Sequence, residues 1–248
     1  MDRMIYVAMS GAKQAMEQQA SVANNMANVS TPGFRAQLNN FRAVPVVGAE
    51  APTRAFVVAT TPGADMRNGP LTETGRPMDV AVRGDGWLTV QTANGNEAYT
   101  RVGNLQVGAD GQLMTMDKLP VIGDAGPMAV PPGAAVMIST DGLVSAIGAG
   151  DPATNVAQIG RLKLVNPASS DLVRGDDGLF RMRPGAASPD ADPAVTLQTG
   201  AIEGSNVNPV SAMVDMIANA RSFEMQMKTL KSADENDQRA NQLLSMTS

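Results

Sequence analysis

The chain of 248 residues contains no cysteine and no histidine, and only 3% of its residues are aromatic. The absence of cysteine excludes disulfides and thiolate metal sites. The absence of histidine removes the commonest general base, the commonest metal ligand and the usual Ser-His-Asp and Cys-His catalytic groups. We therefore expect no metal and no cofactor, and any catalysis would have to depend on carboxylates.

Runs of basic residues and long apolar runs are absent as well. The formal net charge is −5, which argues against a nucleic-acid-binding surface. No segment approaches the roughly 18 apolar residues that a membrane span requires, so we expect no insertion into a membrane. The apolar run that follows Asp2 and Arg3 is too short for a signal peptide. If the protein leaves the cytoplasm, we expect it to do so without a cleaved signal.

Methionine, by contrast, is abundant, with 17 residues. Its flexible side chain adapts to several packing partners, which suits helices that meet more than one neighbour. Ordinary core filling is still the simpler explanation for any single methionine. The total hydrophobic content of 43% is sufficient for a core, and the length allows one large domain or two.

The C-terminal stretch has the strongest pattern in the sequence. Asn208 is a good N-cap and Pro209 suits the first helical position, and neither glycine nor proline follows. These features predict a helix from Pro209 to about Ser245, roughly 55 Å long at 1.5 Å per residue. Apolar residues recur in steps of three and four: Met213, Met216, Ala220, Phe223, Met227 and Leu230. A helix of this length with so narrow an apolar stripe needs partner helices along its side.

The N-terminal stretch has the same rhythm and predicts a helix from about Arg3 to Asn28. Its stripe consists of Ile5, Ala8, Ala12, Ala15, Gln19, Val22, Met26 and Val29. The simplest arrangement pairs the two helices with each other and leaves a further face for other subunits. Periodicity allows equally a helical hairpin packed on its own globular body. Asn24, Asn25 and Asn28 could cap the end of the first helix or hydrogen-bond a neighbouring chain.

The candidate assembly interface includes side chains from both helices. Its members are Ile5, Ala8, Ala12, Val22, Asn24, Asn25, Met26, Asn28, Met213, Met216, Ile217, Ala220, Phe223, Met227 and Leu230. The first helix is followed by Pro32 and Gly33, which fit the centre of a type II turn with glycine at positive φ.

The middle of the chain has the pattern of strands. Scattered prolines and β-branched residues in 36–70 indicate extended connections without helices. From about 71 to 200, short alternating segments, among them a strand predicted within 159–165, are separated by tight turns, which predicts an antiparallel sandwich or barrel-like body. The turn residues are Asn94 and Gly95, Asp110 and Gly111, Asp141 and Gly142, and Asp177 and Gly178. Asn-Gly is the strongest short hairpin signal.

The sequence thus predicts an α+β fold, with long terminal helices paired as a coiled-coil-like layer and an inserted antiparallel all-β body. We expect an N-terminal helix and turn in 1–35 and an extended connector in 36–70. The β body is expected in 71–200 and the C-terminal helix in 201–248.

Candidate catalytic carboxylates are explained by turn chemistry. Asp85, Asp110, Asp141 and Asp177 each precede a glycine, and Asp176 stands in the last of these loops. The Gly84–Gly86 segment lacks the third glycine of a dinucleotide loop. Trp87 is expected to be a core anchor. We find no catalytic constellation, so we do not expect an enzyme.

Three runs of residues resemble the signatures of bacterial flagellar rod and hook proteins. They are 24–35 (NNMANVSTPGFR), 76–87 (RPMDVAVRGDGW) and 99–105 (YTRVGNL). In the tail, 203–209 (EGSNVNP), 213–217 (MVDMI) and 221–226 (RSFEMQ) look like the C-terminal helix of the same family. The chain departs from the family pattern at 117–120 (DKLP), where a glycine usually stands shortly before the Pro-Val pair, which puts the local turn in doubt.

Within this family, four further segments are most similar to a proximal-rod subunit: 1–6, 61–66, 160–165 and 239–246. The resemblance implies a structural subunit of the rod within the periplasm, exported unfolded through the flagellar secretion apparatus. Its partners would be copies of itself and other proximal and distal rod subunits, with the paired helices forming an inner tube. The alternatives are a distal-rod or hook protein, a secreted β-rich enzyme acting on carbohydrate, and a binding module whose helices hold one partner.

Overall fold

The structure, a computed structural model, describes residues 2–39, 41–45, 55–59, 63–150, 152 and 154–245. The chain divides into two compact units. The helical unit consists of Met1–Val29, Gln37–Ala64 and Val207–Ser248, and the β unit consists of Ser30–Ala36 and Asp65–Asn206. The chain therefore passes between the units at four points, after residues 29, 36, 64 and 206.

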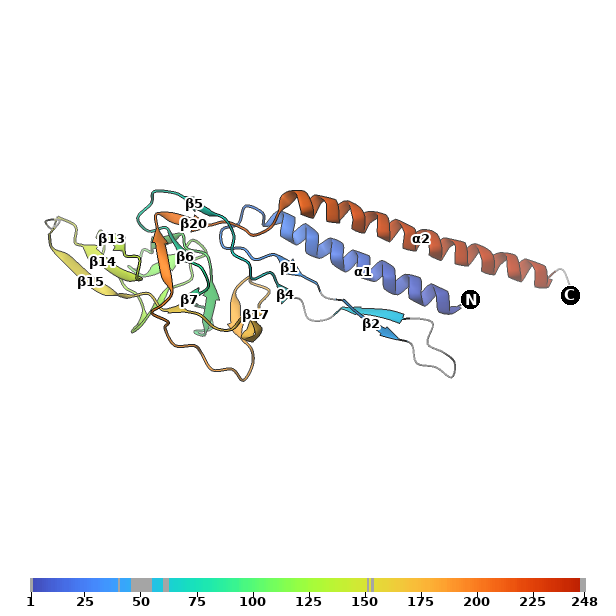
Figure 1. Ribbon diagram of the computed structural model, residues 1–248, viewed down its shortest axis with the longest axis horizontal. Coiled ribbons are helices and arrows are strands. Elements are labelled where there is room, and N and C mark those ends of the chain that lie inside the picture. The colour runs from blue at the N-terminus through green and yellow to red at the C-terminus, as the bar shows by residue number, and fades with distance from the viewer. Residues whose placement is uncertain are drawn as a thin grey trace. The chain divides into compact units, whose positions relative to one another are not determined.

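The helical unit contains α1 (Asp2–Ala27) and α2 (Pro209–Ser245), which lie side by side (Figure 1). The carboxamide oxygen of Asn208 accepts hydrogen bonds from the backbone N–H of Val210 and Ser211, at 3.0 and 3.1 Å. This is the geometry of an N-cap, and α2 begins at the residue that the sequence predicts. Neither helix has, within the described residues, an apolar stretch long enough to cross a membrane.

Two short antiparallel ladders complete the described part of the helical unit. β1 (Gln37–Leu38) pairs with β4 (Gly63–Ala64), and β2 (Phe41–Pro45) pairs with β3 (Ala55–Ala59). Both β1 and β3 contact α1. The strand-like connection expected after the first helix is therefore present as strands, and those strands lie against that helix.

The β unit is built from short antiparallel strands. Its central sheet has the order β16-β7-β8-β18-β17, and β13-β14-β15 form a second sheet (Figure 1). The bounds are β5 Leu71–Glu73, β6 Val80–Arg83, β7 Trp87–Gln91, β8 Glu97–Thr100, β9 Leu105–Val107, β10 Leu113–Thr115, β11 Ile122–Gly123, β12 Gly126–Pro127, β13 Ala135–Ile138, β14 Leu143–Ile147, β15 Val156–Arg161, β16 Leu164–Val165, β17 Leu172–Arg174, β18 Phe180–Met182, β19 Thr196–Thr199 and β20 Ala201–Glu203; η1, a short 3-10 helix, is Ser169–Asp171. Two helices and a mostly antiparallel β body make the fold α+β, as predicted.

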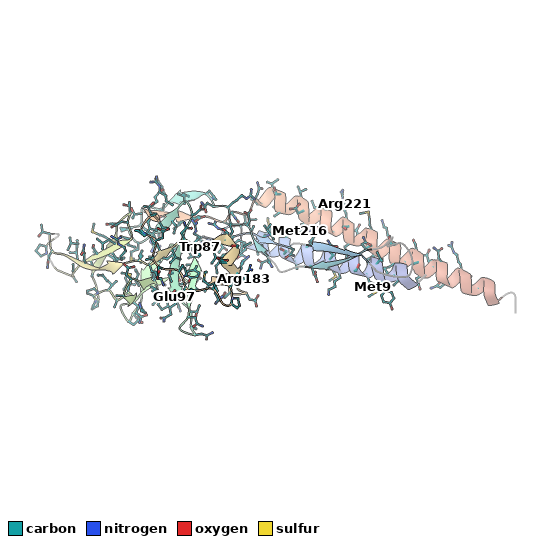
Figure 2. All side chains as sticks on the ribbon, turned by 60° about the horizontal axis from the view of Figure 1, so that its bottom comes forward. Met9, Trp87, Glu97, Arg183, Met216 and Arg221 are labelled. Carbon is teal, nitrogen blue, oxygen red and sulfur yellow. The ribbon has the colours of Figure 1, made fainter. Side chains whose placement is uncertain are left out.

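One continuous hydrophobic cluster fills the β unit. It draws fully buried side chains from most of the strands, among them Leu88, Leu105 and Leu113. Trp87 is also buried, and its ring lies 4.6 Å from that of Phe180, centroid to centroid. Trp87 therefore anchors the core as the sequence suggests, and Figure 2 shows it inside the β unit.

The predicted tight turns lie between neighbouring strands. Asn94 and Gly95 connect β7 with β8, and the amide of Gly95 donates to the Thr92 carbonyl at 2.9 Å. Asp110 and Gly111 connect β9 with β10, whereas Asp141 and Gly142 connect β13 with β14. Pro32 and Gly33 stand in a turn closed by the Phe34 amide and the Thr31 carbonyl at 3.3 Å. All four glycines have positive φ.

The single strand expected over 159–165 is two strands, so this prediction is wrong. β15 pairs with β14 up to Arg161, while β16 pairs with β7 from Leu164. Between them the chain changes sheets, with Leu162 buried in the core and the Lys163 ammonium paired with Glu97 at 2.7 Å. Apolar alternation continues across the change of sheet, so the sequence pattern alone does not reveal it.

Lys118 lies in the segment that departs from the family pattern. It has a φ of 62°, the positive value that favours glycine, and no other non-glycine residue in the described part of the chain does. A side chain in this conformation costs about 1–2 kcal/mol. We predict that Lys118→Gly raises the free energy of unfolding by about 1 kcal/mol, since part of the relief is offset by the greater freedom of glycine in the unfolded chain.

Urea denaturation of the purified protein would measure this gain. Lys118→Ala is the matched control, because it removes the same long side chain but keeps the Cβ and therefore the strain. If both variants change stability equally, backbone strain is not the cause.

Candidate assembly surface and buried charge cluster

The first half of α2 carries an exposed apolar surface. Val210, Met213, Ile217 and Met225 are 68%, 51%, 56% and 62% exposed, and Val214 and Met227 are exposed beside them. We call these six residues the apolar face of α2. Beyond Met227 the described exposed side chains are mostly charged or amide groups. Among the described side chains, the exposed side of the helix is thus apolar only in its first half.

A different stripe of α2 is covered within the chain. Ala212 and Ala233 are buried, and Met216, Phe223, Gln226 and Leu230 are half-buried. The Gln226 carboxamide lies so close to Gly11 of α1 that a Cβ there would lie 2.9 Å from its carbon. The covered stripe therefore combines small, polar and half-buried apolar side chains, while six other apolar side chains of α2 are left exposed.

The predicted assembly residues fall into two groups with respect to this contact. Buried or half-buried within the chain are Ile5, Ala8, Ala12, Val22, Asn25, Met26, Asn28, Met216, Phe223 and Leu230. Exposed are Asn24, Met213, Ile217, Ala220 and Met227. On α1, three residues that lie outside the predicted stripe are also largely exposed: Tyr6, Met9 and Met16. Figure 2 shows Met9 on α1, and Arg221 and Met216 on α2.

The asparagines at the end of α1 bond within their own chain. The Asn25 carboxamide accepts from the backbone N–H of Gln37 at 2.7 Å and donates to the backbone carbonyl of Gln37 at 3.0 Å. Asn25 thus pairs with β1 as a neighbouring strand would. Asn28 donates to the carbonyl of Asn24 at 2.9 Å, which satisfies an acceptor at the helix end.

A buried charge cluster lies in the β unit, and no pattern in the sequence predicts it. The Glu203 carboxylate bonds the Arg35 guanidinium at 2.7 Å and the Arg101 guanidinium at 3.0 Å. Arg35 and Glu203 are each 1% exposed and Arg101 is 4% exposed. We call these three residues the triad. Burying charges is costly unless they are paired and hydrogen-bonded, so each member depends on the others.

Backbone carbonyls and an aromatic ring complete the environment of the triad. Arg101 donates to the Gly84 carbonyl at 2.8 Å, and Arg35 donates to the Asn68 side chain at 3.1 Å. Both guanidinium carbons lie over the Trp87 ring, at 5.9 Å for Arg35 and 5.3 Å for Arg101. Burial lowers the pKa of Arg101, and the Glu203 carboxylate opposes that effect. The hydrogen-bond partners of the triad lie within the β unit, as is typical of a site that stabilises the fold.

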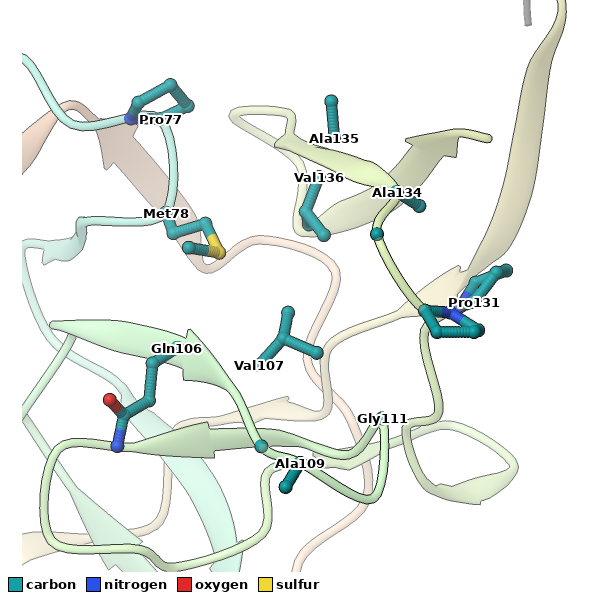
Figure 3. Close-up of a pocket in the computed structure, with 13 residues that line it drawn as sticks. Pro77, Met78, Gln106, Val107, Ala109, Gly111, Pro131, Ala134, Ala135 and Val136 are labelled. Atoms are coloured by element: carbon teal, nitrogen blue, oxygen red, sulfur yellow. The ribbon is translucent and has the colours of Figure 1, made fainter. Parts of the chain in front are cut away.

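Of the candidate catalytic carboxylates, Asp141 alone lines either of two pockets formed by described residues. A pocket of about 640 Å³ is lined by Met78, Val107, Pro131, Val136 and their neighbours, and no charged residue lines it (Figure 3). A smaller pocket of about 100 Å³ has Asp141 on its wall, but that carboxylate is already paired with Arg161 at 3.1 Å. Among the described residues, no group of three or more carboxylates is placed to hold a metal ion.

Three parts of the chain match family models. Residues 5–35 match "Flagella basal body rod protein", 81–146 match "Flagellar hook protein FlgE/F/G D1 domain", and 198–243 match "Flagellar basal body rod FlgEFG protein C-terminal". Each of the three matched parts contributes one member of the triad.

Relatives match over the whole chain. The "Flagellar basal-body rod protein FlgF" of Escherichia coli and that of Salmonella typhimurium are each 56% identical over 252 residues, covering 100% of this chain and 100% of the relative. A "Flagellar basal-body rod protein FlgG" of Buchnera aphidicola is 32% identical, covering 90% of this chain and 92% of the relative. On this similarity, the chain belongs to the FlgF family of flagellar basal-body rod proteins.

Proposed function

We propose that the protein is a structural subunit of the flagellar basal-body rod that assembles through the exposed apolar surface of its terminal helices. The observation that carries this proposal is the apolar face of α2. Its six residues stand close together on one helix and lie outside the contact with α1. Contiguous apolar surface of this kind on a soluble chain commonly marks a protein interface.

The partners of this face are the terminal helices of neighbouring rod subunits. Methionine supplies three of its six residues (Met213, Met225 and Met227), and methionine adapts to neighbours of different shape. That property suits a subunit that contacts copies of itself as well as other rod proteins. The polar second half of α2 would meet polar neighbours or hydrated space instead, because its exposed side chains are mostly charged or amide groups.

The arrangement of the helices suits a tubular assembly. Paired as a coiled-coil-like layer, α1 and α2 would form the inner part of the rod, with the β unit inserted between them in sequence. Head-to-tail association that does not close into a ring produces a helical filament. Torque would then pass through many helix contacts and would require no bond chemistry. In this proposal, 1–35 and 201–248 supply the helical layer, 36–70 is the connector and 71–200 is the β body.

The same proposal accounts for the route to the assembly. A rod subunit lies within the periplasm, and this chain would reach that place through the flagellar export apparatus, unfolded and without a cleaved signal peptide. The family and the named rod relatives support the basal-body location. We propose that the protein requires no cofactor, binds no nucleic acid and does not insert into a membrane.

Deletion of α2 tests the proposal. A chain that ends at Val207 retains every strand of the β unit and the triad, so we expect it to fold. In cells that lack the native gene, this chain should fail to restore rods and motility, whereas the full chain should restore both. Fluorescence of the single tryptophan, Trp87, would show that the truncated β unit is folded. Rod assembly by the truncated chain would refute the role of the terminal helices.

A further inference from the structure

We infer that the triad, together with Asn206, forms a joint that ties together the four chain connections between the helical unit and the β unit. The connections lie after residues 29, 36, 64 and 206. This inference rests on the proposed function for its significance, because a rod subunit must pass force between its parts. All groups that form the joint belong to the β unit.

Asn206 joins three of the connecting segments. Its carboxamide oxygen accepts from the Ala36 amide at 2.7 Å. Its amide group donates to the carbonyls of Asp65 and Arg67, both at 2.8 Å. The Asp65 amide also donates directly to the Ala36 carbonyl at 2.8 Å. One side chain just before α2 therefore holds the segment that leaves the β unit at 36 and the segment that re-enters it at 65.

Glu203 joins the same segments from the buried side. Its carboxylate bonds Arg35 and also accepts from the Gly69 amide at 2.8 Å. Its backbone carbonyl accepts from the Gly33 amide at 2.8 Å, in the turn that follows α1. The close approach leaves no room for side chains: a Cβ on Gly33 would lie 2.5 Å from the Arg101 carbonyl carbon, and one on Gly69 would lie 2.1 Å from the Gly204 oxygen.

Arg101 fastens this group to the sheet. It follows β8, which is paired with β7 in the central sheet, and its guanidinium reaches Glu203. The four connections are thus bound to one another and to the central sheet, through Arg101 and through the Arg174 guanidinium of β17, which donates to the Arg35 carbonyl at 3.2 Å. Every covalent path between the units enters the β unit at this joint, so force carried along the chain reaches the β unit there.

The joint is polar, whereas the centre of the β unit is apolar. Removing its hydrogen bonds should therefore release the connecting segments before the strands of the core separate. We predict a local opening confined to 30–36, 65–69 and 201–206. A purely structural contribution to the core would instead lower protection throughout the β unit.

Hydrogen–deuterium exchange on the purified full-length protein tests this inference. Glu203→Gln keeps the shape of the side chain and removes its charge, and Asn206→Ala removes three hydrogen bonds without leaving a buried charge unpaired. In both variants we expect exchange in the three segments to become at least about tenfold faster, because hydrogen bonds of this kind contribute about that factor to an opening equilibrium. Exchange in β7, β9 and β10 should stay unchanged.

Glu73→Gln is the matched control, since Glu73 is exposed and lies on β5, which pairs directly with β20. It should leave all segments unchanged. Uniformly faster exchange throughout the β unit, or no change in the three segments, would overturn the inference. The measurement uses the monomer, so a negative result would refute the joint but would not test the proposed function as a rod subunit. If Glu203→Gln does not fold, Asn206→Ala alone decides the question.

Motility measures the consequence for force. In cells that carry the Asn206→Ala chain and form normal numbers of flagella, we expect swimming to slow more than in the parent strain as viscosity rises. Equal slowing in both strains would refute the transmission of force through the joint, while the exchange result would still stand on its own.

Discussion

A single methyl group at residue 103 is expected to destabilise the β unit strongly. Gly103 lies so close to β6 that a Cβ at this position would be 1.6 Å from the carbonyl oxygen of Val80. That neighbour is backbone, which cannot rotate away as a flexible side chain can. Gly103→Ala therefore requires either β6 or the segment after Arg101 to move.

Neither movement is cheap. The Val80 amide donates to the Gly103 carbonyl at 2.9 Å, and Asp79 and Asn104 form an antiparallel β-bridge beside it. Val80 is 1% exposed, and β6 is paired along its length with β19. We expect Gly103→Ala to lower the free energy of unfolding by about 4 kcal/mol or more, the range reached when a substitution forces a buried structure to rearrange.

Urea denaturation followed by Trp87 fluorescence would measure the loss. Gly178→Ala is the control: Gly178 has a positive φ of 79°, but a Cβ there meets no atom within 4 Å. That variant should lose only about 1 kcal/mol, the cost of backbone strain. Equal losses in the two variants would show that the contact with Val80 yields easily and that the prediction is wrong.

Local signals in the sequence were sufficient to predict where α2 begins and where the hairpin turns lie. The start of α2 follows from Asn208 and Pro209, whose physical effects act within one turn of the helix. Asn94 and Gly95 mark a hairpin for the same reason, because the ease with which a residue adopts a positive φ depends on the residue itself. The α+β class then follows from the order of helical and alternating segments.

The covered side of α1 was predicted correctly, since every residue of its stripe is buried or half-buried. The covered side of α2 was predicted only in part, because it depends on distant parts of the chain. The stripe from Met213 to Leu230 was expected to lie along one seam. Three residues of that stripe, Met216, Phe223 and Leu230, are half-buried, but Met213, Ala220 and Met227 are exposed. Ala212 and Ala233, which lie outside the predicted stripe, are buried. A small residue marks the stripe that a neighbouring helix approaches closely, but small residues carry little weight in a hydrophobic pattern.

The triad was also beyond sequence reasoning, although its residues lie in the quoted family motifs. Arg35 ends one motif, Arg101 lies within a second, and Glu203 begins a third. They are separated by as many as 168 residues, and a charged residue in a sequence is normally expected at the surface. Only the fold shows that these charged groups pair with one another in the interior.

Placing two lysines on the apolar face of α2 is expected to abolish rod assembly and leave the monomer intact. Met213 and Ile217 are about half exposed in the monomer, so Met213→Lys with Ile217→Lys removes little internal packing. Lysine also has a high helix propensity, so α2 should form as before. In an assembled rod, the same positions would bury charge against apolar neighbours.

The expected loss is large because it repeats at each subunit. Burying a methionine or isoleucine side chain fully contributes about 1.5–3 kcal/mol, so the exposed halves of two such side chains contribute about 2 kcal/mol to each contact. That alone weakens each contact about thirtyfold. The buried lysine charges add to the loss, and a filament needs every successive contact.

Asp215→Lys is the matched control, since it changes the net charge by the same +2 on the same helix. Residue 215 lies about 200° around the helix from both Met213 and Ile217, and its side chain is exposed. Counting rods in basal bodies isolated from complemented cells, with circular dichroism of each purified variant, separates assembly from folding. If the double variant assembles as the parent does, neighbouring subunits do not use the apolar face. If the contacts instead form through the polar second half of α2, association would weaken as salt concentration rises.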